Sequence, residues 1–264
     1  MWNAPFSDVH FSPFIVGYSQ NTANASGNTM MAPTFLSVSS ETGCTLADLS
    51  VTGYDAPTWN EDDEEYEGGC LGGQFILSFL TSSGTYEARY YWIDDGEIAP
   101  GWYSTGGGKA IDGGAASVTI AAGQGAWVLG RGMKLQTAGA VNENDVAKKM
   151  NTTGNTAVGN CTPIDLTLGR LTVTGYDSPT WNEDDEEYEG GCLGGQFILN
   201  YLTSSGTYEA RYYWIDDGEI APGWYSTGGG KAIDGGATSV PFAAGKGAWV
   251  LGKGMYLNIP APEL

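Results

Sequence analysis

Residues 74–93 read QFILSFLTSSGTYEARYYWI, and this stretch decides the fold class. In its first run Phe75, Leu77 and Phe79 fall on one face, which is the period of a β-strand that is mostly buried. The second run, 86–93, also fits a strand, and the segment TSSGT between the runs (81–85) is rich in turn-forming residues. The two runs therefore predict a β-hairpin.

Further strand-like runs surround this hairpin at 14–18, 33–38, 49–54, 117–120, 126–130 and 133–135. Glycine and proline separate nearly all of them, and no segment shows the ten or more residues of helical period that an α-helix needs. About eight short strands with turns between them predict an all-β module, a small sandwich or a barrel.

A near-exact repeat organises the chain. Residues 49–135 recur at 171–257 with a constant offset of 122, and only ten of the 87 aligned positions differ. We expect two tandem modules, 1–136 with an N-terminal strand arm and 137–264, because each copy contains a full set of strands. Between them, AVNENDVAKKM (140–150) is predicted to form a short helix or an extended connector.

The charge of the chain excludes several functions. The 31 acidic residues against 11 Lys and Arg give a net charge of −20, so nucleic acid and anionic membranes would be repelled. The only histidine is His10, which argues against imidazole-based catalysis and His-rich metal sites. No 18-residue apolar run predicts a transmembrane segment, and the start lacks a leader peptide, which either has been removed or never existed.

The order of short motifs resembles tandem β-rich modules of secreted, uncharacterised surface proteins of Verrucomicrobia-type and Planctomycetes-type bacteria. The motifs are GNT (27–29, 154–156), a VTGYD strand, GWY (101–103, 223–225) and AAG-x-GAWVLG (121–130, 243–252). The resemblance implies a secreted, surface-associated β module and transfers no catalytic residue. The acidic, cysteine-containing insertion of this sequence departs from that pattern.

Each module carries an acidic segment, DAPTWNEDDEEYEGGC in the first copy, and the two segments hold fourteen of the 31 acids. Such crowded carboxylates either form a solvated acidic face or bind a hard cation through oxygen, for which Ca²⁺ is the candidate cofactor. A second acidic turn, IDDGE (93–97), is more typical of a polar β-turn than of a ligand set. The candidate metal ligands are Asp55, Glu61, Asp62, Asp63, Glu64, Glu65, Glu67, Asp177, Glu183, Asp184, Asp185, Glu186, Glu187 and Glu189.

Each module also has two cysteines, and we expect them to pair within the module, Cys44 with Cys70 and Cys161 with Cys192. Such disulfides would favour an oxidising location, outside the cell or at its surface. The alternative is four free, buried thiols in a cytosolic protein. A zinc site is disfavoured because no C-x-x-C spacing is present.

Nine tryptophans are many for this length. Loop tryptophans and tyrosines beside carboxylates can stack on sugar rings or contact protein partners, whereas Trp92 and Trp127 lie in strands and are expected in the core. The candidate ligand-binding residues are Trp59, Tyr66, Trp102, Tyr103, Trp181, Tyr188, Trp224 and Tyr225.

These features favour a non-enzymatic extracellular structural or interaction protein, a self-assembling surface, fibre or tube subunit with Ca²⁺-binding loops. The alternative is a tandem carbohydrate-binding module or adhesin, in which duplication raises avidity. The expected partners are accordingly other copies of the chain or a surface glycan, and no catalytic motif is recognisable.

Overall fold

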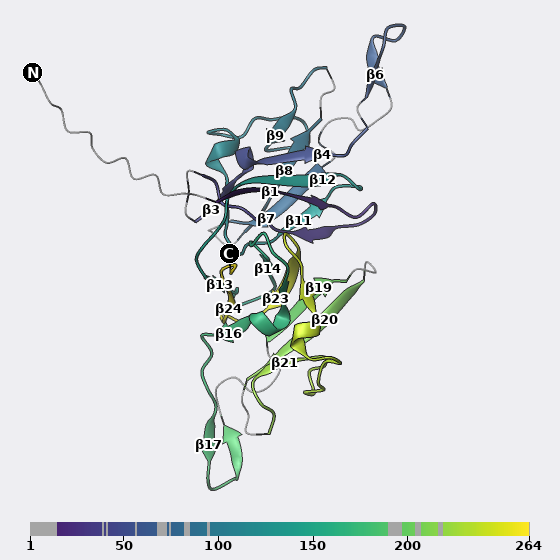
Figure 1. Ribbon diagram of the computed structural model, residues 1–264. Helices are drawn as coiled ribbons and strands as arrows, with labels where there is room; N and C mark the ends of the chain where they lie inside the picture. Colours follow the sequence, from purple (N-terminus) through teal and green to yellow (C-terminus); the bar gives the residue numbers. More distant parts are fainter. Residues whose placement is uncertain are drawn as a thin grey trace, which may run out of the picture.

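The computed structural model describes residues 15–38, 40, 42–55, 57–67, 73, 75–81, 85–93, 96–189, 197–203, 207–215 and 219–263. Within these residues the chain is all-β, with four short 3₁₀ turns and no α-helix, which confirms the predicted fold class (Figure 1). No helix in these ranges is long and apolar enough to span a membrane.

The first module contains twelve strands. They are β1 (Val16–Thr22), β2 (Thr29–Met31), β3 (Gly43–Thr45), β4 (Leu49–Thr52), β5 (Thr58–Asn60), β6 (Glu65–Glu67), β7 (Phe75–Leu80), β8 (Tyr86–Trp92), β9 (Gly101–Tyr103), β10 (Thr119–Ala121), β11 (Ala126–Leu129) and β12 (Lys134–Ala140).

The second module repeats this set. Its strands are β13 (Val146–Lys149), β14 (Thr156–Gly159), β15 (Leu166–Thr167), β16 (Thr172–Thr174), β17 (Thr180–Asn182), β18 (Glu187–Glu189), β19 (Phe197–Leu202), β20 (Tyr208–Trp214), β21 (Gly223–Tyr225), β22 (Pro241–Phe242), β23 (Gly247–Leu251) and β24 (Tyr256–Ile259).

The sheet order is the same in both modules. A five-stranded sheet, β2-β11-β7-β8-β9, packs against a three-stranded sheet, β1-β12-β4, and the second module has β14-β23-β19-β20-β21 and β13-β24-β16. Two-stranded sheets add β10-β3 and β15-β22, while the hairpins β5-β6 and β17-β18 stand apart. The tandem organisation expected from the repeat is therefore confirmed, and every strand pair is antiparallel.

The hairpin predicted within residues 74–93 lies at the centre of the five-stranded sheet. Strands β7 and β8 pair with Phe75 opposite Tyr91 and Leu80 opposite Tyr86. Phe75, Leu77 and Phe79 are buried and join residues of the three-stranded sheet in one core. The period-2 pattern thus places one face of β7 between two sheets, as in a β-sandwich.

Two local predictions are wrong. The segment 33–38 contributes only one isolated bridge, from Leu36 to Ala140, and crosses over β1 instead of joining a sheet as a strand. Strand β12 continues to Ala140 because it pairs with β1 over seven residues, so a boundary at 136 falls inside this strand. The connector between the modules is 141–145, and the following Val146–Lys149 is a strand.

The modules contact each other through the outer faces of their five-stranded sheets. Trp127 alternates with the buried Ala126 and Val128, so it points away from its own core and meets Trp249 of the other module at 4.7 Å between ring centroids. The expectation that Trp127 fills the core is therefore wrong, whereas Trp92 is buried as expected.

This contact follows a pseudo-twofold axis. Tyr86 meets Trp249 at 6.1 Å, and its repeat equivalent Tyr208 meets Trp127 at 6.3 Å. The backbone contacts pair in the same way, since Met31 bridges Lys246 while Gln124 bridges Val158. An interface that uses the same surface on both partners is isologous, and here it occurs within one chain.

Hydrogen bonds reinforce the same symmetry. The N–H of Ala32 donates to the Gly245 carbonyl at 2.9 Å, and the N–H of Gly159 donates to the Gly123 carbonyl at 3.0 Å. Glycines fit here because the two backbones approach closely: a Cβ at position 159 would lie 2.1 Å from that of Ala32. The two modules are accordingly held in one defined orientation.

Candidate functional site

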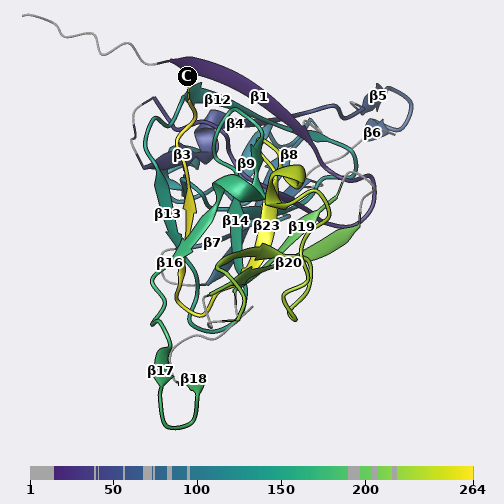
Figure 2. The same ribbon diagram turned by 60° about the horizontal axis from the view of Figure 1, so that its bottom comes forward.

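Two acidic hairpins project from the two ends of the paired modules, β5-β6 from one and β17-β18 from the other (Figures 1 and 2). Each is a three-residue ladder closed by a four-residue turn, with Trp59 opposite Tyr66 and Trp181 opposite Tyr188. The turn closes through a positive φ at Glu64 and at Glu186. The hairpins are therefore a repeated structural unit outside the sandwich.

An asparagine organises each acidic turn. The Asn60 Nδ2 group donates to Asp63 at 3.0 Å and to Glu67 at 2.9 Å, while the N–H of Asp62 donates back to Asn60 Oδ1. Asn182 makes the same three bonds in the second module. These bonds fix the turn backbone and neutralise none of its charge, so the carboxylates face solvent together.

The predicted metal ligands lie on these hairpins or beside them. All fourteen carboxylate residues are exposed in the structure. Among the residues described, no group of three or more His, Cys, Asp or Glu side chains converges in a way that could hold a metal ion. The arrangement within one hairpin is thus an exposed acidic face, the first of the two alternatives for this segment.

The aromatic residues of each hairpin form one exposed pair. The rings of Trp59 and Tyr66 contact edge-to-face at 5.1 Å, and 49% of Trp59 remains exposed. Trp181 and Tyr188 repeat the contact at 5.1 Å, with Trp181 48% exposed. Tyr66 packs against Gly96, where a Cβ would overlap its ring, so the hairpin contacts the 96–100 loop. Each hairpin thus presents one large apolar group to solvent, Trp59 on the first and Trp181 on the second.

Trp102 and Trp224 do not belong to the candidate binding set, which corrects the prediction. Trp102 is only 8% exposed, its ring contacts Phe75 and Tyr91, and its indole N–H donates to the Leu49 carbonyl at 2.9 Å. This bond joins the two sheets of the sandwich, because Trp102 lies in β9 and Leu49 in β4.

Trp224 makes the equivalent bond to the Leu171 carbonyl at 2.9 Å. Tyr103 and Tyr225 are half-buried, and their hydroxyls donate to the carbonyls of Ala99 and Ala221 at 2.8 Å. The GWY motifs therefore tie loops and sheets together.

The cysteines are not equivalent between the modules. Cys44 pairs with Ile120 across β3-β10, and the matching position in β15 is Leu166, opposite Phe242. Cys44 and Cys161 are buried free thiols in the described part of the chain. Burial raises the pKa of both thiols, and Asp48 adds to the effect at Cys44. The expected partners, Cys70 and Cys192, lie outside the described residues, as do Asp94 and Asp95 of the acidic turn.

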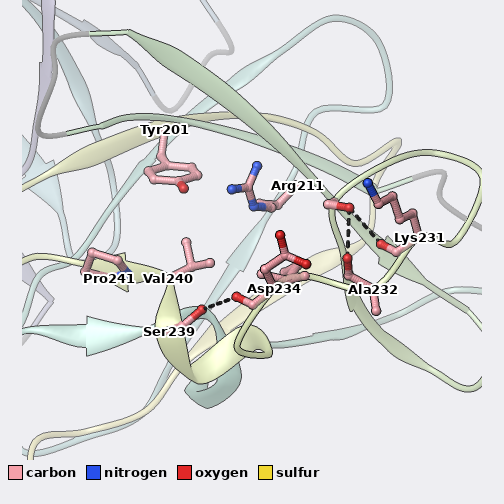
Figure 3. A pocket seen from close by; sticks show the side chains of 10 residues that line it. Tyr201, Arg211, Lys231, Ala232, Asp234, Ser239, Val240 and Pro241 are labelled. Carbon is pink, nitrogen blue, oxygen red and sulfur yellow. Dashed lines mark hydrogen bonds between the residues drawn. The ribbon is translucent and has the colours of Figure 1, made fainter.

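A pocket of about 320 Å³ opens in the second module between strands β19 and β20 and the segment 226–241. Figure 3 shows the Arg211 guanidinium between the ring of Tyr201 and the carboxylate of Asp234. Sequence reasoning missed this site because its residues are far apart in the chain. The lining residues are Tyr201, Arg211, Ser226, Lys231, Ala232, Ile233, Asp234, Ser239, Val240 and Pro241.

One signal in the sequence points to this pocket. Arg211, like Arg89 in the first copy, is a cation in the middle of a strand, YEARYYW, in which four of the other six residues are aromatic. Its side chain is 16% exposed, and its Nε is buried without a hydrogen-bond partner. Glu209 compensates the charge of Arg211 at 2.7 Å, and the guanidinium still lines the pocket.

Comparisons with protein-family models, with curated proteins and with solved structures give no significant match.

Proposed function

We propose that the chain is a non-enzymatic structural protein that connects to neighbouring copies of itself through the two acidic hairpins. The observation that carries the proposal is the pseudo-twofold pairing of the modules, which directs two near-identical hairpins away from a fixed body (Figure 1). A unit with two equivalent ends joins into a linear assembly when each end binds the same end of a neighbour.

The surface of the hairpin supports a contact function. Trp59 and Trp181 remain about half exposed although each already packs on a tyrosine. Tryptophan is enriched in the energetically dominant parts of protein interfaces. The asparagine-centred turns hold each hairpin in one shape, so little conformational entropy is lost when it binds.

The charge of the hairpin implies a cation in the contact. Two facing hairpins would bring two sets of six acidic residues together and repel each other. Ca²⁺ prefers six to eight oxygen ligands, so carboxylates supplied jointly by two molecules suit it better than those of a single exposed hairpin. We therefore include Ca²⁺ in the proposal, with its ligands shared between neighbours.

Sedimentation velocity over a range of protein concentrations, in calcium and in EDTA, tests the proposal. The chain is expected to form species larger than dimers in calcium and to return to monomers in EDTA. The double variant Trp59→Ala, Trp181→Ala should remain monomeric in both. Tyr18→Ala serves as the matched control, because Tyr18 is an exposed aromatic residue (60%) on the edge strand β1.

Monomers under all conditions would overturn the proposal. Calcium-dependent assembly of the double variant would show that the hairpins are not the contact surface. The extracellular or cell-surface location expected from the sequence is part of the same proposal.

A further inference from the structure

We infer that the pocket of the second module binds a small acidic carbohydrate, a sugar that carries a carboxylate such as a uronate. The site is separate from the hairpins and uses different residues. Its volume of about 320 Å³ lies at the lower end of the range for ligand pockets, which suits a ligand the size of one sugar ring.

The floor of the pocket is a preorganised arginine. The Arg211 Nη2 group donates to Glu209 at 2.7 Å, Nη1 donates to the Ala210 carbonyl at 2.8 Å, and the guanidinium lies 5.5 Å from the centre of the Tyr201 ring. These contacts leave Nε–H as a buried donor without a partner. An unpaired buried donor is costly. The Nε of Arg89 in the first module is buried and unpaired in the same way, so this donor is common to both copies and does not by itself select a ligand.

The rim adds a second cation and hydrogen-bonding groups. Lys231 and Asp234 are exposed at the mouth, and within the described part of the chain neither side chain makes a hydrogen bond or ion pair. Their backbone is fixed, because Ser226 Oγ donates to the Lys231 carbonyl at 2.9 Å and Ser239 Oγ donates to the Asp234 carbonyl at 3.0 Å. Both charged side chains thus stand on a constrained loop.

The combination of groups selects the ligand class. Of the eleven cations in a chain of net charge −20, two line this one pocket. Arg211 is paired with Glu209, so Lys231 is the cation available to the carboxylate of a ligand. Asp234 accepts hydrogen bonds from sugar hydroxyls, and the Tyr201 ring, Val240 and Pro241 provide apolar surface for the C–H face of the ring.

The repeat supplies a matched comparison inside the same chain. Eight of the ten lining residues are identical at the equivalent positions of the first module, and the two that differ are Tyr201 for Phe79 and Pro241 for Thr119. Lys109 and Asp112 are the equivalents of Lys231 and Asp234, so the same substitutions at these two positions serve as matched controls. The reverse changes, Tyr201→Phe and Pro241→Thr, give the second pocket the first module's residues at these two positions.

Isothermal titration calorimetry on the full chain tests the inference, with D-galacturonate and D-glucuronate as probes, D-galactose and D-glucose as neutral counterparts, and inorganic sulfate as a bare anion. Binding should require the carboxylate, and Lys231→Ala and Asp234→Asn should each weaken it at least about tenfold. Lys109→Ala and Asp112→Asn should leave it within about twofold. Both rim residues are exposed, so these variants should keep the parent circular dichroism spectrum.

Arg211→Lys tests the floor of the pocket. It keeps the positive charge and removes the fork of donors, so it should weaken uronate binding as well. The inference is overturned if no uronate binds, if neutral sugars or sulfate bind as tightly as the uronates, or if Lys109→Ala lowers affinity as much as Lys231→Ala. Self-association measured on the same variants should be unchanged, because the hairpins lie outside the pocket.

Discussion

The packing of the two modules predicts a measurable energetic coupling between Trp127 and Trp249. Trp249→Ala removes a half-buried indole together with its edge-to-face contacts to Trp127 and Tyr86. Replacing a fully buried tryptophan by alanine costs about 3–5 kcal/mol, so half of that value, plus about 0.5–1.5 kcal/mol for each of the two ring pairs, gives a loss of about 4 kcal/mol.

The pseudo-twofold symmetry sets two further expectations. Trp127→Ala should cost the same within about 1 kcal/mol, because it removes the equivalent contacts from the other side. The double variant should lose about 1 kcal/mol less than the sum of the two single losses, since the Trp127–Trp249 contact can be lost only once.

Urea unfolding followed by circular dichroism supplies these values, provided that each variant unfolds in one transition. Trp59→Ala and Trp181→Ala are the controls, because each ring contacts only one tyrosine and is about half exposed. A coupling energy within about 0.3 kcal/mol of zero would refute the docked arrangement, as would single losses that differ by more than about 2 kcal/mol.

Three other predictions concern the first module. Trp102→Phe should lower the free energy of unfolding by about 1–3 kcal/mol because the Leu49 carbonyl loses its buried donor, and urea unfolding would show this. Burial raises the pKa of the Cys44 thiol in the folded state above its unfolded value of 9.0. Above pH 9 the thiol therefore ionises in the unfolded chain and stays neutral in the folded chain, so the free energy of unfolding should decline as pH rises. In Cys44→Ala this decline should be smaller by up to about 1.4 kcal/mol per pH unit, which thermal melts between pH 8 and 10 would measure. A variant whose stability falls with pH as steeply as that of the parent chain would contradict a buried thiol at this position. Gly96→Ala should release Tyr66 from the 96–100 loop, because Gly96 has φ of 82° and a Cβ would overlap the ring; faster proteolysis within the hairpin would report it, and parent-like cleavage would count against the contact.

Much of the fold was predictable because its signals are local. The alternation in 75–80 encodes a strand with one buried face, and the repeat encodes two copies of the same module. Strand β12 was underestimated because its C-terminal half, QTAGA, has no apolar alternation and is held by pairing with β1. Pairing between distant segments leaves no mark on either sequence alone.

The sites were harder to predict for the same reason. Trp102 and Trp59 both sit in short polar stretches, yet one bonds across two sheets and the other is exposed on a hairpin. Each module has one cysteine before the repeat, Cys44 or Cys161, which made the two look equivalent. The structural equivalent of Cys44 is instead Leu166, because the segment before the repeat differs in length between the modules. The pocket joins residues from 201 to 241, and only the folded chain brings them together.

The most direct test of the two-ended assembly is mass photometry of the single variant Trp181→Ala in calcium. That variant keeps one intact hairpin, so the account predicts dimers and nothing larger, whereas the parent chain forms longer species under the same conditions. Trp59→Ala should behave identically, because the two hairpins are equivalent. Assemblies as long as those of the parent chain in either single variant would contradict the claim that the hairpins are the connecting ends.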